Sequence, residues 1–224
     1  MNQQNNGHEH EFEPELGLPE PLPAGEKILW QGSPDIADMA YRVFHLKKFV
    51  FYFGLMLLYR AVSHVMEGKS TVDTLFAMTF PAVLTVVALA SVMTLAWLTA
   101  KTTVYTLTDQ RVVMRIGIVL TLTFNLPLKV IESAGLNLSA KGFGDIPLKL
   151  KGEDRIAWLN LWPHARPWII NKPEPMMRCI PDASKVAEKL VQAWSNSTGI
   201  AVEPADNKVE KAVKNAVNWN PSLT

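Results

Sequence analysis

The sequence predicts a membrane protein in which a hairpin of two transmembrane helices carries a cytoplasmic antiparallel β-sheet domain closed by a C-terminal helix. Three observations predict this fold class. Residues 74–100 form a run of 27 residues without a charge, and the segment after Lys101 shows strand signals in quick succession between closely spaced turns. Residues 182–196 carry an apolar stripe with helical spacing. Charged residues make up only 19% of the chain, below the roughly 25% that is typical of soluble domains.

The first 26 residues predict a flexible acidic arm. They hold six Glu, no Lys or Arg, and four prolines. Such a stretch cannot bury enough apolar surface to offset the entropy lost on ordering. The arm is either a solvated tail or a segment that docks on a basic partner surface. Residues 27–48 follow it as a juxtamembrane segment.

Two apolar segments predict the transmembrane hairpin. About 20 apolar residues cross a hydrocarbon core of roughly 30 Å, so the run 74–100 is long enough. The run 49–66 is interrupted by Arg60 and His64, and we expect Arg60 to extend toward the nearer interface. A re-entrant or surface-lying helix is the alternative for this second run. Residues 67–73 join the two runs, which makes them neighbours in a hairpin.

Basic residues beside these runs predict the orientation of the hairpin. Arg42, Lys47 and Lys48 precede the first run, and Lys101 follows the second. Because cytoplasmic flanks carry an excess of Lys and Arg, both termini are expected in the cytoplasm and the connecting loop outside. The one cysteine, Cys179, is then in a reducing compartment, where an unpaired thiol is normal.

The segment after Lys101 predicts a small β domain at residues 101–197. Turn residues separate short strand-forming segments, of which 118–126 alternates apolar and polar residues, and this is typical of an antiparallel meander. Val186, Leu190 and Trp194 form the apolar stripe of the helix at 182–196, and we expect this helix to cover the open end of the sheet. The polar tail at 198–224 is either a short helix or disordered. The strands are expected at residues 102–108, 111–116, 118–126, 130–138, 145–151 and 155–162.

Several blocks of the sequence resemble known bacterial membrane proteins. Glu26–Asp35 (EKILWQGSPD) and Thr103–Gly117 (TVYTLTDQRVVMRIG) resemble the leading motif and first hairpin of membrane proteins with a pleckstrin-homology-like domain. Arg166–Leu190 and Glu11–Pro23 are similar to the PuhB-type assembly proteins of purple-bacterial photosynthetic reaction centres. The resemblance covers residues 11–197. It implies a pleckstrin-homology-like fold for the β domain and a multi-pass protein of the photosynthetic intracytoplasmic membrane, the bacterial inner membrane.

The resemblance also implies a function, which is assembly of the reaction centre and its core light-harvesting antenna. The leading hypothesis is a non-enzymatic factor that holds reaction-centre subunits and core antenna polypeptides during their association. A lipid-binding membrane adaptor unrelated to photosynthesis is one alternative, and delivery of bacteriochlorophyll is another.

The sequence contains no motif that indicates catalysis or metal binding. It has no glycine-rich phosphate loop, zinc-protease motif or nucleophile elbow, so we expect no enzyme activity, metal or cofactor. His64 is the pigment-ligand candidate, because an imidazole in a membrane span can bind the magnesium of bacteriochlorophyll. An interfacial hydrogen-bonding role is the alternative for His64. The net charge of +1 argues against a nucleic acid as a partner.

Two kinds of partner are expected from the two parts of the chain. Small residues on the run 74–100 would let transmembrane helices of a client approach closely. Residues 101–224 hold 16 basic and 11 acidic residues, so anionic lipid headgroups are a further expected partner. Self-association into a homo-oligomer is compatible with the sequence. The interaction candidates are Trp30, Arg60, Trp158, Trp162 and Trp168, with core packing as the alternative for each tryptophan.

Overall fold

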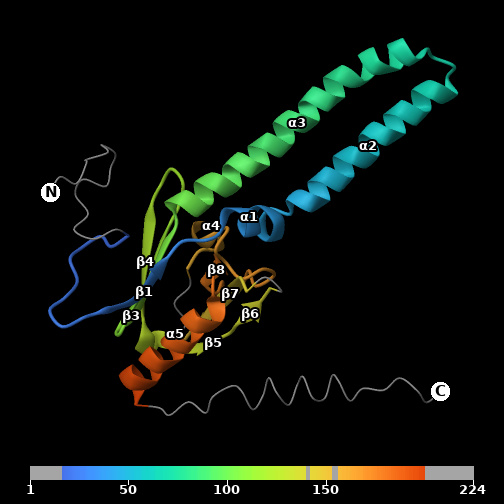
Figure 1. Cartoon of the computed structure of the whole chain (residues 1–224). Coiled ribbons are helices and arrows are strands. Elements are labelled where there is room, and N and C mark those ends of the chain that lie inside the picture. The colour runs from blue at the N-terminus through green and yellow to red at the C-terminus, as the bar shows by residue number, and fades with distance from the viewer. Residues whose placement is uncertain (1–16, 140–141, 153–155, 200–224) are drawn as a thin grey trace, which may run out of the picture.

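The computed structural model describes residues 17–139, 142–152 and 156–199. Two long apolar helices, α2 (Leu46–Met66) and α3 (Thr71–Thr102), lie side by side as a hairpin that projects from the β domain (Figure 1). Ser70 caps α3, and its hydroxyl oxygen accepts the Asp73 N–H at 3.1 Å. Both helices contain the runs expected at 49–66 and 74–100, and both are long and apolar enough to cross a membrane.

One face of α3 packs on α2 and the other faces outward. The buried and half-buried residues of α3 recur every three or four positions, which places them on one side of the helix. Large apolar side chains on the outer side stay exposed, including Phe76 at 74% and Phe80 at 72%. An apolar surface of this extent indicates contact with lipid or with another protein. The inward stripe comprises Met78, Pro81, Ala82, Thr85, Ala88, Leu89, Val92, Leu95, Ala96 and Thr99.

Helix α3 continues into the first sheet without a loop. Thr103 is its extended C-cap, and β2 (Val104–Thr108) begins at the next residue. The first sheet has the order β1 (Ile28–Gly32), β2, β3 (Arg111–Ile116) and β4 (Leu122–Pro127), with every pair antiparallel. In the second sheet β7 (Gly144–Leu150) pairs with β5 (Ile131–Ala134), β6 (Asn137–Leu138) and β8 (Met176–Ile180).

Short helical turns connect these parts. The turn α1 (Ile36–Asp38) and the π-helical turn η1 (Met39–Val43) lead from β1 into α2. The 3₁₀ turn η2 (Leu128–Val130) joins the two sheets, and α4 (Trp158–Leu161) lies between β7 and β8.

The C-terminal helix α5 (Ala183–Thr198) covers the core as expected. Leu190 is 2% exposed, and the Trp194 indole N–H donates to the Ile131 carbonyl at 3.1 Å. Lys185 and Lys189 lie on the exposed side of the helix. The core joins both sheets to α5 and includes Tyr105, Leu107, Val112, Met114, Ile116, Leu126, Leu128, Ile131, Ile146, Leu148, Met177, Val186 and Leu190.

The expected single meander of six strands is wrong in part. The described residues form two four-stranded sheets, and β1 and β8 are strands that the sequence analysis did not expect. The strand expected at 155–162 is instead the helical turn α4. Trp158 and Leu161 are three positions apart, so the same apolar residues also fit one turn of helix. The strand expected from 118 begins only at Leu122, because Gly117 turns the chain with a φ of +115°.

The expectation of a flexible arm is wrong for its last part, residues 17–26. Leu18 is 2% exposed, and a Cβ on Gly17 would lie 2.6 Å from Cγ1 of Val104. Glu26 accepts two hydrogen bonds from the Arg111 guanidinium, at 2.8 and 3.0 Å. One apolar side chain and one ion pair therefore fix a segment whose composition indicated mobility. The first 16 residues of the arm, and the expected tail beyond residue 199, lie outside the described residues.

Candidate functional site: an arginine groove at the base of the hairpin

Three arginines and one aspartate line a cavity of about 570 Å³. Arg42 comes from η1, Arg166 from the loop after α4 and Arg178 from β8. We call this cavity, with Arg42, Arg166, Arg178 and Asp145, the arginine groove. Because η1 packs on both α2 and α3, the groove lies at the base of the hairpin.

Arg42 is held in place by two carboxylates. Its guanidinium donates to Oδ2 of Asp38 at 2.7 Å and to Oδ2 of Asp145 at 2.5 Å. The second oxygen of Asp145 accepts the Cys179 N–H at 2.9 Å, and Asp145 is only 4% exposed. Burial raises the pKa of the Cys179 thiol, and the nearby Asp145 and Asp38 raise it further. The thiol therefore stays protonated at neutral pH. The hydrogen bonds of Asp145 to Arg42 and to the Cys179 N–H connect η1 to β7 and β8.

Arg178 carries a charge in the groove for which the described residues supply no counter-ion. Its Nη1 donates to the Pro163 carbonyl at 3.1 Å, and its Nε is buried without a hydrogen-bond partner among the described residues. Arg166, in contrast, donates to Oε2 of Glu174 at 2.8 Å. A guanidinium with free donors beside two others suits a phosphate or carboxylate, which can accept a forked pair of N–H groups.

A second cavity of about 290 Å³ adjoins the groove and shares Arg42 and Arg178 with it. Three of the expected interaction residues, Trp158, Trp162 and Trp168, line it together. Trp168 is 96% exposed, so core packing does not account for it. Trp162 is 46% exposed, with one edge against Phe44 at a ring-centroid distance of 6.0 Å, whereas Trp158 packs partly against the core.

His45, the residue before α2, completes this second cavity. Partial burial lowers its pKa, and the positive charges of Lys48 and Arg178 lower it further. His45 is therefore neutral at pH 7. The cavity combines aromatic rings and arginines at the point where α2 begins, which is the position that tryptophan and basic residues favour at a membrane surface.

A buried hydrogen-bonded chain lies beside the groove. The backbone N–H of Arg178 donates to the Tyr105 hydroxyl at 3.1 Å, and this hydroxyl lies 2.6 Å from Nδ1 of His164. Nε2 of His164 lies 3.1 Å from the Thr103 hydroxyl, so a neutral imidazole donates one of these two hydrogen bonds and accepts the other. Burial and the charge of Arg178 lower the pKa of His164 to about 3, and burial raises that of Tyr105. Both groups are therefore neutral and serve to position β8.

The other expected site residues lie elsewhere. Trp30 packs against the core from β1, and Arg60 is exposed on α2. His64 lies in the last turn of α2, half-buried, and its Nδ1 has no hydrogen-bond partner among the described residues. In the part of the chain that the structure describes, no group of three His, Cys, Asp or Glu residues can hold a metal ion.

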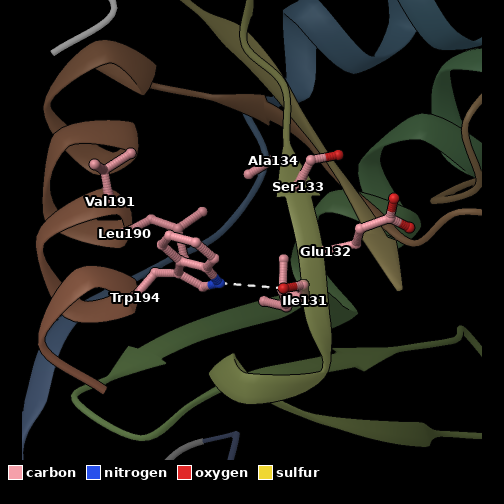
Figure 2. Close-up of a pocket in the computed structure, with 7 residues that line it drawn as sticks. All are labelled: Ile131, Glu132, Ser133, Ala134, Leu190, Val191 and Trp194. Carbon is pink, nitrogen blue, oxygen red and sulfur yellow. Dashed lines mark hydrogen bonds between the residues drawn. The ribbon is translucent and has the colours of Figure 1, made fainter. Parts of the chain in front are cut away.

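A smaller apolar cavity of about 170 Å³ lies between β5 and α5 (Figure 2). Leu190, Val191 and Trp194 of α5 face Ile131 and Ala134 of β5 across it. The hydrogen bond from Trp194 to the Ile131 carbonyl crosses from one element to the other. The contacts around this cavity hold α5 on the sheet. Among the described residues, Glu132 is the one charged residue that lines it.

No pattern in the sequence indicated the three arginines of the groove as a site. The basic residues of 101–224 were counted together, and that count does not single out residues 42, 166 and 178. Four prolines between residues 163 and 175 indicate an extended connection in the sequence. The backbone instead turns back there, with Ala165 bridged to Pro175, and this brings Arg166 close to Arg178. No spacing in the sequence indicates that contact.

The chain is similar to known bacterial proteins over most of its length. The family described as Bacterial PH domain matches residues 53–194, which include most of the hairpin and both sheets except β1. A Rhodobacter capsulatus protein named "Uncharacterized 23.7 kDa protein in puhA 5'region" is 40% identical over 190 residues, covering 83% of this chain and 87% of that protein. No solved structure matches the chain. The match to more than half of the chain shows that it belongs to the bacterial PH domain family.

Proposed function

We propose that this protein is a non-enzymatic membrane assembly factor for the photosynthetic reaction centre and its core antenna. The observation that carries the proposal is the 40% identity to a Rhodobacter capsulatus protein named for the puhA 5' region, which hints at a photosynthesis-related role. The resemblance of residues 166–190 to reaction-centre assembly proteins supports the same role.

The hairpin is the first surface that would meet a client. The inward stripe of α3 packs on α2, so it is not available to a client. Ala90 and Ser91, in contrast, are exposed on α3. The Ser91 hydroxyl donates back to the Val87 carbonyl at 2.8 Å, so it adds no unsatisfied group to the lipid phase. A client helix can approach such small residues closely.

The second surface is the cavity lined by Trp158, Trp162 and Trp168, which we call the tryptophan cavity. Trp162 and Trp168 expose aromatic rings next to arginines. Tryptophan and arginine are enriched among the residues that contribute most of the binding energy at protein interfaces. In our proposal the client's soluble segments bind there while its helices bind the hairpin.

The proposed location is the photosynthetic intracytoplasmic membrane, with both termini in the cytoplasm. Lys47, Lys48 and Lys101 lie at the same end of the hairpin, and the opposite loop offers only Lys69. This asymmetry supports the orientation. Reporter fusions at residue 70 and after the last residue test it, because a periplasmic signal from the C-terminal fusion would contradict an even number of spans.

Binding of anionic phospholipid is a second candidate function. The specific observation in its favour is Arg178, whose charge has no carboxylate partner in the described residues and whose cavity lies beside the start of α2. This function is independent of photosynthesis and can also coexist with the first.

Deletion of the gene in its photosynthetic host tests the first proposal. We expect less assembled reaction centre, with continued bacteriochlorophyll synthesis, slow phototrophic growth and normal respiratory growth. Membrane absorbance spectra and pulse–chase labelling of the subunits measure this. Full reaction-centre levels would overturn the proposal. Reduced levels caused by missing pigment would favour bacteriochlorophyll delivery, and His64→Ala would be the next variant.

Complementation separates the tryptophan cavity from the rest of the chain. Trp168→Ala should complement poorly and lose co-purifying reaction-centre subunits, because Trp168 is 96% exposed and its removal leaves the core intact. Ile170→Ala is the matched control, since Ile170 is 68% exposed in the same loop. Equal complementation by both variants would contradict a role for the cavity.

A further inference from the structure

The turn between β3 and β4 exposes apolar side chains at its apex. We call residues 117–121 the β3–β4 tip. Val119 is 89% exposed and Leu120 is 80% exposed, and the chain has no charged residue between Arg115 and Lys129. Turns at the surface of a soluble domain are normally polar, so this tip needs an apolar environment of its own.

The tip lies beside the end of α3. Arg115 of β3 pairs with Val104, the first residue of β2, and β2 follows α3 directly. Three further residues at about 3.3 Å each carry the apex roughly 10 Å beyond that level, back along the helix. Ile118 and Thr121 line one cavity of about 440 Å³ together with Ala100 and Lys101 of α3. Figure 1 shows the tip extending next to the lower end of α3.

Two basic residues near the tip lie where the uncharged part of α3 ends. Lys101 is in the last turn of α3, and Arg115 lies at the foot of the tip; both line the cavity that the tip shares with α3. Every residue of α3 from Thr74 to Ala100 is uncharged. Basic residues next to an apolar segment are typical of the headgroup layer of a bilayer.

The shape of the tip is fixed by Gly117. Its φ is +115°, and a Cβ at this position would lie 2.0 Å from the Leu120 carbonyl oxygen. Only glycine adopts this turn without strain. Val119 and Leu120 are therefore held at the apex in advance of any contact.

We propose that the β3–β4 tip inserts into the bilayer that α3 crosses, with Val119 and Leu120 among the upper acyl chains. Arg115 and Lys101 lie at the phosphate level of the same leaflet. The hairpin and the tip then attach the β domain to the membrane at two separate points, which fixes its orientation. The inference rests on the part of the proposed function in which the hairpin spans the membrane.

Site-specific fluorescence tests the insertion. The full chain is placed in nanodiscs of phosphatidylcholine and phosphatidylglycerol, and an environment-sensitive label is attached to Leu120→Cys, Phe76→Cys or Lys185→Cys. The native Cys179 is fully buried, so it competes little for the label. Phe76 is an outward residue of α3. Lys185 is exposed on α5, and Figure 1 shows this helix on the side of the β domain away from the hairpin.

We expect labels at Leu120 and Phe76 to be blue-shifted and quenched severalfold by nitroxide lipids, with no change at Lys185. Quenching at Phe76 but not at Leu120 would overturn the insertion of the tip and leave the spanning hairpin intact. No quenching at either position would overturn both. Reaction-centre yield is measured separately, so neither result decides the assembly role.

A second variant keeps the test independent of labelling. Val119→Ser with Leu120→Ser should speed amide hydrogen exchange at residues 118–121 severalfold in nanodiscs, because the bilayer no longer shields the apex from water. Val191→Ser on α5 is the control and should leave the exchange rates at residues 118–121 unchanged. Equal rates in the wild type and the tip variant would contradict the inference.

Discussion

The Tyr105 hydroxyl and Nδ1 of His164 lie 2.6 Å apart, although the two residues are separated by 59 positions in the chain. The contact connects β2, which continues the hairpin, to the loop that carries the tryptophan cavity. Because both side chains are fully buried, their protonation states affect the stability of the fold.

Acid should destabilise the protein through His164. Its pKa is about 3 in the folded chain and ordinarily 6.5, so the unfolded chain binds the proton more readily. The contribution of neutral His164 to the free energy of unfolding is therefore fully present above pH 6.5 and is lost as the pH falls toward 3. Between pH 7 and pH 5 we expect a loss of about 2 kcal/mol. Denaturant unfolding of the detergent-solubilised chain measures this, and His164→Gln should remove that component of the pH dependence.

Loss of the Asp145 charge should loosen the base of the hairpin. Asp145→Asn removes one of the two charged acceptors of Arg42 and weakens the bond to the Cys179 N–H, with an expected cost of about 2 kcal/mol. Chemical denaturation of the full chain provides the measurement. Glu132→Gln breaks an exposed pair with Lys149 and should cause no measurable change. If the two variants were equally stable, the buried network would not be structural.

Truncation of Leu190 should strongly destabilise the β domain. Leu190 is 2% exposed between α5 and the sheets, so Leu190→Ala should cost about 2–5 kcal/mol through lost burial and a new cavity. Lys185→Ala, on the outer side of the same helix, should change the free energy of unfolding by about 0.5 kcal/mol or less. Similar unfolding curves for both variants would contradict the packing of α5 on the core.

Neutralisation of Arg178 should weaken binding of anionic lipid. We expect Arg178→Gln to raise the Kd for short-chain phosphatidylglycerol about tenfold, which corresponds to about 1.4 kcal/mol. Arg178→Lys keeps the charge but loses the forked donors, so its effect should be intermediate. Calorimetry in neutral micelles measures the Kd, with phosphatidylcholine as the neutral lipid and inorganic phosphate as competitor.

Lys185→Gln removes an equal charge on α5, away from the groove, and serves as the control. A matching loss in Arg178→Gln and Lys185→Gln would indicate attraction by overall charge rather than a site. Competition by inorganic phosphate alone would assign the groove to a free anion.

The elements that were correctly predicted carry their signal in one continuous segment. Helix α3 is visible as the uncharged run 74–100, and α5 is visible from the spacing of Val186 and Leu190. Strands β2 and β3 follow each other around a short turn, and their β-branched residues together with that turn were sufficient to predict them. Local patterns determine these elements because each one buries one face that the sequence itself displays.

The elements that were missed depend on contacts between distant segments. Strand β8 is identified by its pairing with β7, and its five residues do not alternate in polarity. The arginine groove combines η1 with two residues from more than 100 positions later in the chain. Exposure of a tryptophan is also a tertiary property, which is why Trp30 and Trp168 looked equivalent in the sequence and differ in the fold.

The absence of a loop between α3 and β2 gives the protein a mechanical property. With 32 residues, α3 is a rod about 48 Å long, and its last residue is followed only by Thr103 before the sheet begins. Thr103 is itself held by His164, so the joint has little freedom to bend. A tilt of about 5° at this joint would move the far end of the rod by roughly 4 Å, given that length. A force on the outer end of the hairpin would therefore act through a long lever arm, and the sheet would turn with the helix.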